Sequence, residues 1–268
     1  MHPSALYFGK KFFDTYIKDI SEPLNINEIG SQDVNGSIRD FFVCKDNIIY
    51  TGLDFTQGKG VDILISDPYR LPVEDASTDV VVTSSCLEHS ELFWLSFSEM
   101  LRILKPGGLI YINVPSNGYI HRYPVDCWRF YPDSGKALET WGRRCGYGVT
   151  LLESFTSAQF SHLQEDRWSD YIAVFAKGDI RANSVQRMSF CTDKTLKNIY
   201  TNIHGIQDTD FTPEDFKIQE KYKNQVADIQ KRLDLVVHSY ENKLGKVRTS
   251  IPRTKNENFS HLISMGYQ

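Results

Sequence analysis

Short apolar runs alternate with helical stretches through the first two thirds of the chain. Residues 4–20 place apolar side chains at helical spacing and Pro23 ends this pattern, which predicts an N-terminal helix within residues 1–24. The apolar runs that follow predict strands at Ile26–Ile29, Ile48–Leu53, Val61–Ile65, Asp79–Ser84, Leu109–Val114, Val149–Phe155 and Tyr171–Ala176. A further helix is expected at Leu92–Leu104, where Lys105-Pro106-Gly107-Gly108 stops it and turns the chain into the next strand.

This alternation predicts an α/β fold with a largely parallel sheet. Strands joined through helices form right-handed crossovers, and the helices cover both faces of the sheet. Sheets of this kind bind ligands beyond the carboxyl ends of their strands, at the point where the strand order reverses. We therefore expect the functional residues directly after the predicted strands, in a domain that spans residues 25–178.

The pattern changes in residues 179–268, where no run of residues indicates a strand. The sequence Thr212-Pro213-Glu214-Asp215 is typical of a helix start. Apolar residues then recur at steps of three or four and predict an amphipathic helix over about residues 213–248, in a helical C-terminal extension. A helix of this length either pairs with a second copy in a homodimer or lies back across the core, and the sequence leaves both arrangements open.

Composition and charge narrow the class of protein. The chain is 41% hydrophobic and 24% charged, and no apolar run approaches the roughly 18 residues of a membrane span. Its net charge of −4 argues against a nucleic-acid partner. The five cysteines form no close pair, which is typical of reduced thiols, and the histidines and acids show no metal-ligand spacing. We therefore expect a cytoplasmic protein without a membrane span or a metal site.

Polar residues suited to a nucleotide follow the first three predicted strands. The first strand ends at Glu28-Ile29-Gly30-Ser31, a turn that lets the backbone approach a ligand closely. Asp54 follows the second strand, where its carboxylate can accept hydrogen bonds from a ribose diol. Asp67 follows the third, where it can accept the amine of an adenine that Pro68 and Tyr69 flank. Each residue alone also fits an ordinary turn, but the three strand ends together indicate a nucleotide-like cofactor.

Two further passages resemble a known family, the class I S-adenosylmethionine-dependent methyltransferases of the type 11 group. The first passage is Leu71-Pro72-Val73-Glu74-Asp75-Ala76-Ser77-Thr78-Asp79-Val80, and the second is Leu101-Arg102-Ile103-Leu104-Lys105-Pro106-Gly107-Gly108. The resemblance covers about residues 24–178. It implies a Rossmann-like sheet of seven strands, the last of them antiparallel, and S-adenosyl-L-methionine as methyl donor. One departure is that Gly30-Ser31-Gln32-Asp33-Val34-Asn35-Gly36 replaces the usual G-x-G-x-G.

The resemblance also implies which residues contact the cofactor. The positions carried over are Glu28, Gly30 and Ser31 for the methionine part, Asp54 with Phe55 for the ribose, Asp67 and Pro68 for the adenine, and Ser85 and Leu87 for the sulfonium. The altered glycine loop and the long helix also suit a non-catalytic scaffold protein that oligomerises through that helix. Asp54 and Asp67 favour the methyltransferase instead.

The segment after the fifth strand, Asn113–Pro132, carries the candidate acceptor residues. Methyl transfer to an oxygen needs orientation and benefits from a general base, for which histidine is suited at neutral pH. His121 is the first candidate for this base, its alternative being a loop histidine bonded to a carbonyl. His89 is the second candidate, with a structural role as its alternative. Asp126 and Arg129 either orient the acceptor or pair with each other and order the loop.

The passage Tyr123-Pro124-Val125-Asp126-Cys127-Trp128-Arg129-Phe130-Tyr131 is similar to that of methyltransferases encoded with bacterial surface-polysaccharide pathways. This resemblance implies an O-methyltransferase with a small-molecule acceptor, such as a sugar, a nucleotide-sugar or a phosphate-linked precursor of capsule or lipopolysaccharide. Methylation of protein or nucleic acid is disfavoured by the acidic domain and by the lack of a basic, aromatic-lined groove in the sequence.

Overall fold

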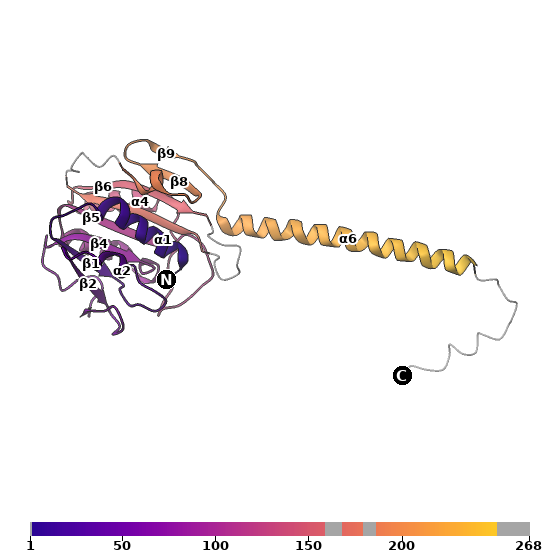
Figure 1. Ribbon diagram of the computed structural model, residues 1–268, viewed down its shortest axis with the longest axis horizontal. Helices are drawn as coiled ribbons and strands as arrows, with labels where there is room; N and C mark the ends of the chain where they lie inside the picture. Colours follow the sequence, from indigo (N-terminus) through magenta and orange to yellow (C-terminus); the bar gives the residue numbers. More distant parts are fainter. Residues whose placement is uncertain (1, 159–167, 179–185, 251–268) are drawn as a thin grey trace. The chain divides into compact units, whose positions relative to one another are not determined.

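The computed structural model describes residues 2–158, 168–178 and 186–250. The chain divides into two compact units, Met1–Asp215 and Phe216–Gln268. The first unit contains the sheet, and the described part of the second belongs to one long helix (Figure 1). Within the described ranges, no helix combines the length and the apolar character that a membrane span requires.

The sheet of the first unit is mixed, with the strand order β3-β2-β1-β4-β5-β7-β6-β8-β9. Its strands are β1 (Leu24–Ile29), β2 (Ile48–Asp54), β3 (Ile63–Leu64), β4 (Thr78–Ser84), β5 (Leu104–Pro115), β6 (Val149–Ser157), β7 (Asp170–Lys177), β8 (Leu196–Thr201) and β9 (Gly205–Gln207). Strands β1 to β5 pair in parallel, whereas β7 is antiparallel to both β5 and β6. The α/β class, the seven predicted strands and the antiparallel last strand among them are therefore confirmed.

Two strands lie beyond the seven predicted ones and correct the prediction. Strand β8 pairs antiparallel with β6 and with β9, so that the sheet continues after Gly178. The expectation of no strand in this part, and hence of seven strands in the sheet, is wrong. The four residues between Leu196 and Thr201 are all half-buried, so β8 lacks the alternation of buried and exposed positions by which a strand is predicted.

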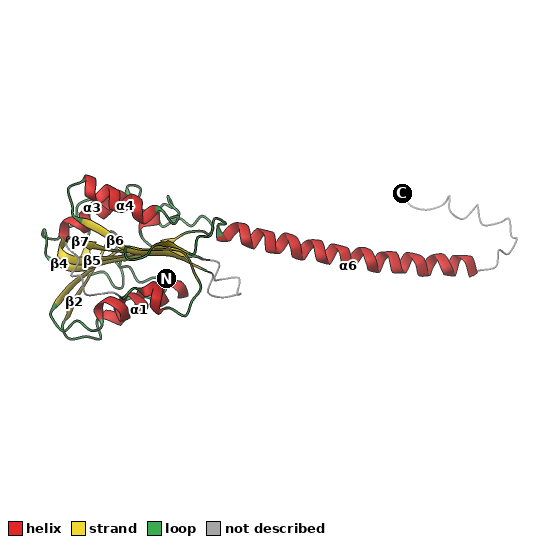
Figure 2. Ribbon diagram, turned by 90° about the horizontal axis from the view of Figure 1, so that it is seen from above, coloured by secondary structure: helices red, strands yellow, loops and turns green. Residues whose placement is uncertain are grey.

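Helices cover both faces of the sheet, as expected for parallel strands. They are α1 (Pro3–Phe12), extended by a π-helical turn (Phe13–Ile17), α2 (Arg39–Phe42), the 3-10 turn η2 (Leu87–His89), α3 (Phe93–Ile103), α4 (Ser134–Arg144) and α5 (Met188–Cys191). Figure 2 shows α3 and α4 over one face and α1 over the other. Phe12 of α1 stacks on Tyr111 of β5, and Phe97 of α3 packs against Phe175 of β7. These rings are fully buried, and burial of each stabilises the fold by roughly 1.5–3 kcal/mol.

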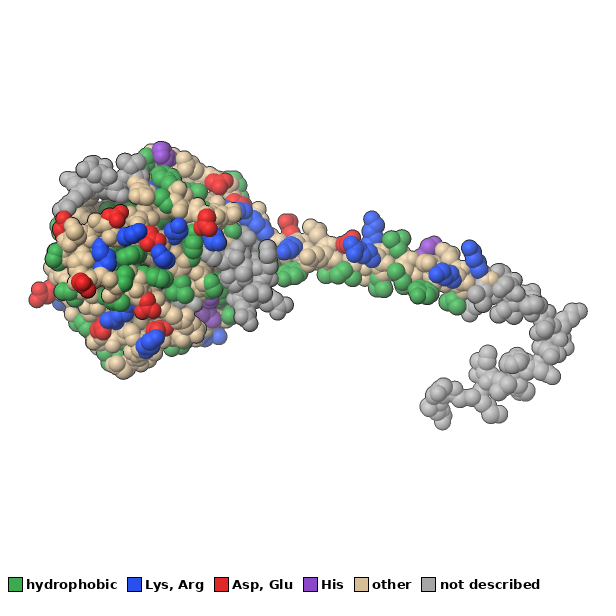
Figure 3. Space-filling view, in the orientation of Figure 1, with side chains coloured by type: hydrophobic (Ala, Val, Ile, Leu, Met, Phe, Trp, Pro, Cys, Tyr) green, Lys and Arg blue, Asp and Glu red, His purple; other side chains and the backbone are tan. Residues whose placement is uncertain are grey.

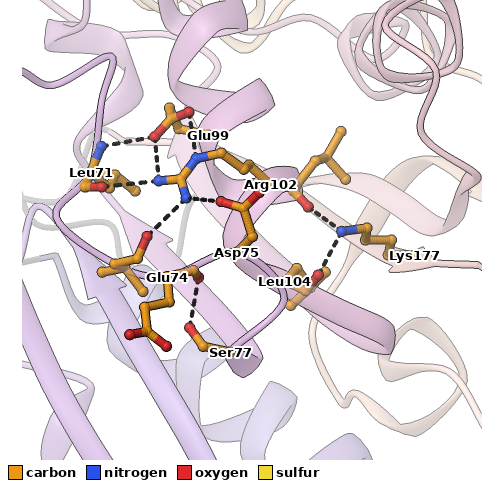
Figure 4. A network of polar contacts seen from close by, with 10 residues as sticks. Leu71, Glu74, Asp75, Ser77, Glu99, Arg102, Leu104 and Lys177 are labelled. Atoms are coloured by element: carbon orange, nitrogen blue, oxygen red, sulfur yellow. Dashed lines mark hydrogen bonds and ion pairs between the residues drawn. The ribbon is translucent and has the colours of Figure 1, made fainter.

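Arg102 of α3 holds the segment that leads into β4 (Figure 4). Its guanidinium forms ion pairs with Glu99 at 2.7 Å and Asp75 at 2.6 Å. It also donates hydrogen bonds to the carbonyl oxygens of Leu71 and Val73. The two passages that resemble the methyltransferases therefore meet at this side chain.

The helix α6 (Glu214–Ser250) confirms the predicted amphipathic helix. Most of its apolar side chains lie along one side of the helix, as Figure 3 shows. The stripe consists of Val226, Ile229, Leu233, Val236 and Tyr240, which are spaced by three and four residues and are each more than half exposed. We call these five residues the α6 stripe. An apolar stripe at this spacing is typical of helices that pair in coiled coils.

Candidate active site

A cavity of about 780 Å³ opens at the carboxyl ends of the central strands. In the sheet, β1 lies between β2 and β4, so that the strand order reverses beside β1. This is the position at which open parallel sheets bind ligands, and it is the position that the sequence predicts. The predicted cofactor residues that line the cavity are Glu28, Gly30, Ser31, Asp54, Phe55, Pro68, Ser85 and Leu87.

Glu28 and Ser31 present buried polar atoms to this cavity. Each residue is only 2% exposed. Neither Oε2 of Glu28 nor Oγ of Ser31 has a hydrogen-bond partner in the described part of the chain. Burial raises the pKa of Glu28 to about 7, because a carboxylate removed from water is less stable than the neutral acid. Buried polar atoms normally have partners, so these two atoms fit the polar end of a bound ligand.

Gly30 and Ser85 shape the floor of the cavity. Both have a left-handed backbone, with φ of +79° and +52°. A Cβ atom on Gly30 would lie 2.5 Å from both Cβ and Sγ of Cys86, far inside van der Waals contact. Only glycine therefore allows β1 and the turn after β4 to approach so closely.

Asp54 lies at the end of β2, 6% exposed, and its carboxylate already accepts two hydrogen bonds. They come from the backbone N–H groups of Gln32, at 3.1 Å, and Thr56, at 3.0 Å. These bonds fix the carboxylate in the cavity wall, and each oxygen keeps a second lone pair for a ligand hydroxyl. The neighbouring Phe55 is 50% exposed and lies in the same wall.

Asp67 differs from the other predicted cofactor residues. It is exposed, accepts a hydrogen bond from the N–H of Tyr69, and does not line the cavity, whereas its neighbours Ser66, Pro68 and Tyr69 do. The structure thus brings the adjacent side chains to the cavity, and the contact between Asp67 and an adenine stays a prediction.

The loop after β5 is attached to η2 through backbone hydrogen bonds. The N–H groups of Cys127 and Trp128 both donate to the carbonyl of Glu88, and Nδ1 of His89 donates to the carbonyl of Val125 at 2.5 Å. This attachment brings the ring of His121 to 4.9 Å from that of His89. Both candidate bases therefore lie together in the cavity wall.

Asp126 and Arg129 lie behind His121 and do not line the cavity. Their side chains form a bidentate ion pair, in which Nη1 of Arg129 lies 2.6 Å from Oδ1 of Asp126 and Nη2 lies 2.8 Å from Oδ2. Asp126 also accepts a hydrogen bond from the backbone N–H of His121, and its Oδ2 lies 3.4 Å from Nδ1 of that ring. Hydrogen bonds from Arg129 lower the pKa of Asp126 to about 2. The two residues thus pair with each other and order the loop that carries His121.

Some residues in or beside the cavity were not among the predicted site residues: Trp168 and His2 line it, and the buried Glu88 lies next to the lining residue His89. Burial raises the pKa of Glu88 to about 8, and its Oε2 has no hydrogen-bond partner in the described ranges. Its place next to His89, directly after the fourth strand, is the signal that could have drawn attention to it. The buried Trp168 packs against the rings of His121 and His2, at 5.0 and 4.8 Å. No sequence pattern marks these two residues, because one precedes α1 and the other precedes β7.

Comparison with known families identifies the chemistry of the fold. Residues 45–112 match a family described as "Methyltransferase domain". The matched stretch includes Asp54, at the end of β2, and the whole Arg102 network. The protein is an S-adenosylmethionine-dependent methyltransferase.

Solved structures of other methyltransferases are similar to this chain. The 1,6-didemethyltoxoflavin-N1-methyltransferase of Burkholderia thailandensis, with bound 1,6-didemethyltoxoflavin and S-adenosylhomocysteine, is 14% identical and has a TM-score of 0.50, over 66% of this chain and 79% of its own. Phosphoethanolamine N-methyltransferase 2 of Haemonchus contortus, in complex with S-adenosyl-L-methionine, is 12% identical, with a TM-score of 0.43 over 65% of this chain and 52% of its own. No curated protein matches the chain. At these identities the likeness concerns the fold and not the acceptor.

Proposed function

We propose that this methyltransferase methylates a hydroxyl oxygen of a small molecule, which is a sugar, a nucleotide-sugar or a phosphate-linked precursor of a surface polysaccharide. The observation that carries the proposal is the position of His121 in the wall of the same cavity that the strand ends line. A basic imidazole beside the methyl donor suits an oxygen acceptor, because a hydroxyl must lose its proton as the new bond forms.

The cofactor half of the cavity binds S-adenosylmethionine, which supplies an electrophilic methyl group on a sulfonium. Glu28 and Ser31 bind its methionine part, since Oε2 of Glu28 and Oγ of Ser31 are buried and lack partners among the described residues. Asp54 binds the ribose diol through its remaining lone pairs. The other contacts in this proposal are Gly30, Phe55, Asp67, Pro68, Ser85 and Leu87.

The reaction breaks one O–H bond and one S–C bond. The oxygen supplies the electron pair of the new O–C bond, and the electron pair of the broken S–C bond stays on sulfur. An imidazole of the cavity wall, that of His121 or of the adjacent His89, accepts the proton of the hydroxyl. The Asp126–Arg129 pair contributes by holding His121 in place, which supports transfer through orientation.

The acceptor half of the cavity supports a phosphorylated sugar. Tyr119, Tyr123 and Trp168 line it with aromatic rings, against which the apolar face of a sugar can pack. Arg122 also lines it, and its exposed guanidinium has no ion pair or hydrogen bond with another described residue. An unpaired guanidinium is suited to a phosphate, which it binds through two parallel hydrogen bonds.

The proposal is tested by calorimetry followed by methyl-transfer assays. Wild type and His121→Ala should both bind S-adenosylhomocysteine with micromolar or tighter affinity. Only wild type should methylate sugar and sugar-phosphate acceptors, with turnover at least a hundredfold above that of the variant. His204→Ala, a change at an exposed histidine outside the cavity, is the matched control. Loss of cofactor binding in His121→Ala would overturn the role of His121, and methylation of nitrogen acceptors alone would overturn the oxygen acceptor.

We also propose that the chain forms a homodimer through the α6 stripe. The five side chains of the stripe are exposed and apolar, and their spacing of three and four residues matches the seam of a coiled coil. A second copy of the same stripe is complementary to it in spacing and in character. Burial of the stripe against this copy would remove it from water.

We place the enzyme in the cytoplasm. All five cysteines are free, and four of them are exposed. Thiols in this state are typical of a reducing compartment. Fractionation of cells that express the chain tests this placement, and recovery outside the cytoplasmic fraction would contradict it.

A further inference from the structure

We propose that a divalent transition-metal ion binds at the acceptor wall, with Glu88, His89 and His121 as its ligands. One imidazole nitrogen from each histidine and one carboxylate oxygen lie within 4.8 Å of one another. Two histidines and one carboxylate, with the remaining positions open, form a ligand set that binds Zn²⁺, Fe²⁺ and Co²⁺. Both histidines line the cavity, so that the open positions of the ion face the acceptor.

The side chain of Glu88 is an independent indication of a ligand. The residue is 1% exposed, and its Oε2 has no hydrogen-bond partner among the described residues. A buried carboxylate oxygen without a partner is costly, and a cation offsets that cost directly. The loop cannot serve as this partner, because the N–H groups of Cys127 and Trp128 bind the backbone carbonyl of Glu88 and not its carboxylate.

The outer partner of His89 matches that of a metal ligand, and His121 has a carboxylate within reach of its outer nitrogen. Nδ1 of His89 donates to the carbonyl of Val125, which leaves the lone pair on Nε2, 3.7 Å from Oε1 of Glu88. Nδ1 of His121 lies 3.5 Å from Nη2 of Arg129, which can only donate, and 3.4 Å from the carboxylate of Asp126. For Nε2 to bind the ion, the proton of the ring must lie on Nδ1 and face Asp126 in place of the contact with Arg129. Histidines that bind metals almost always have such a carbonyl or carboxylate behind them, which fixes the tautomer and the ring orientation.

This inference rests on the proposed O-methylation and adds how the wall acts on the hydroxyl. With the ion bound, the ion would take the place of the imidazole base. The lone pair of His121 would hold the ion, the ion would polarise the acceptor hydroxyl, and water would take up the proton. The O–C bond then forms as the S–C bond breaks, with the electron pair retained on sulfur. The ion is neither oxidised nor reduced. Sequence spacing does not indicate this site, because His121 reaches it from a different loop.

The experiment is a titration of the full-length chain with Co²⁺ after treatment with EDTA, followed by visible absorption and calorimetry. Wild type should bind one equivalent with micromolar or tighter affinity and without a thiolate charge-transfer band. His121→Ala and Glu88→Gln should each weaken binding at least tenfold. His238→Ala removes an exposed histidine of α6 and should leave binding unchanged. Titration of every variant with S-adenosylhomocysteine shows that the fold is retained.

The outcomes separate this proposal from the proposed function. No stoichiometric Co²⁺ binding by wild type, or equal binding by wild type and the two ligand variants, overturns the metal site. Full methyl-transfer activity in excess EDTA overturns its part in the reaction. Co²⁺ binding with the expected pattern, together with no methylation of any hydroxyl acceptor, retains the metal site and overturns the O-methylation.

Discussion

The hydroxyl of Tyr123 donates a 2.9 Å hydrogen bond to the side-chain oxygen of Gln32. Gln32 lies in the turn after β1, where the family pattern has a glycine, and Tyr123 lies in the acceptor loop after β5. Both residues line the cavity. The departure from the glycine pattern thus supplies a side chain that connects the cofactor turn to the acceptor loop.

This bond predicts that Tyr123→Phe speeds the release of S-adenosylhomocysteine. A single neutral hydrogen bond contributes about 0.5–1.5 kcal/mol, so we expect dissociation to become about two- to tenfold faster. Stopped-flow fluorescence measures this rate. Tyr119→Phe is the matched control, because Tyr119 lies in the same loop and its hydroxyl forms no hydrogen bond with a described residue. Equal acceleration in both variants would contradict the prediction.

Glu28 predicts a pH-dependent affinity for the cofactor. Burial raises its pKa to about 7, and only the ionised carboxylate attracts the ammonium group of the methionine part. The ionised fraction falls as the pH decreases through the pKa, so that the Kd for S-adenosylhomocysteine should rise about tenfold from pH 8 to pH 6. Calorimetry at several pH values measures this dependence. Glu28→Gln should bind weakly with a flat profile, and a flat profile in wild type would rule out the assigned role.

The centre of the fold could be predicted because its strands are buried. In β4, for example, the last five residues are buried, and the apolar residues Val80, Val81 and Val82 among them mark the strand in the sequence. Helix α4 was not predicted for the opposite reason. Its buried positions are Gly135, Leu138, Glu139 and Gly142, only one of which is a large apolar residue, so no apolar run marks the helix in the sequence.

The candidate site could be predicted in its cofactor half and only in part in its acceptor half. Asp54 and Gly30 follow from their positions at strand ends, which topology brings to one edge. The approach of His121 to His89 depends on backbone N–H groups that bind the carbonyl of Glu88. Every residue except proline carries such groups, so the residue types in the sequence do not encode this contact.

If the chain dimerises through the α6 stripe, a single charged residue within the stripe should disrupt the dimer. Light scattering should give the mass of two 30.8 kDa chains for wild type and of one chain for Leu233→Lys, because the lysine places a charge in the apolar seam. Leu235→Lys is the matched control, since Leu235 is exposed on the same helix but lies outside the stripe. A monomeric wild type at high micromolar concentration, or identical behaviour of the two variants, would contradict the dimer.

The contacts of Arg102 predict that its replacement lowers the stability of the fold without weakening cofactor binding. Its guanidinium binds two carboxylates and two carbonyl oxygens, and its side chain is only 21% exposed (Figure 4). Arg102→Ala removes these bonds, and allowing for partial exposure we expect the free energy of unfolding to fall by about 2 kcal/mol. Arg102→Lys should recover less than half of this loss, because an ammonium group cannot form the same fork. Urea unfolding measures both changes.

The control for Arg102 is Arg144→Ala, which changes an exposed arginine at the end of α4. Its free energy of unfolding should stay within about 0.5 kcal/mol of wild type. An equally small change in Arg102→Ala would mean that the network does not hold the segment before β4. A loss in Arg102→Ala with an unchanged Kd for S-adenosylhomocysteine would give the two passages that resemble the methyltransferases a shared structural role. Both passages would then belong to the family pattern because the side chain of Arg102, in the second passage, binds the first.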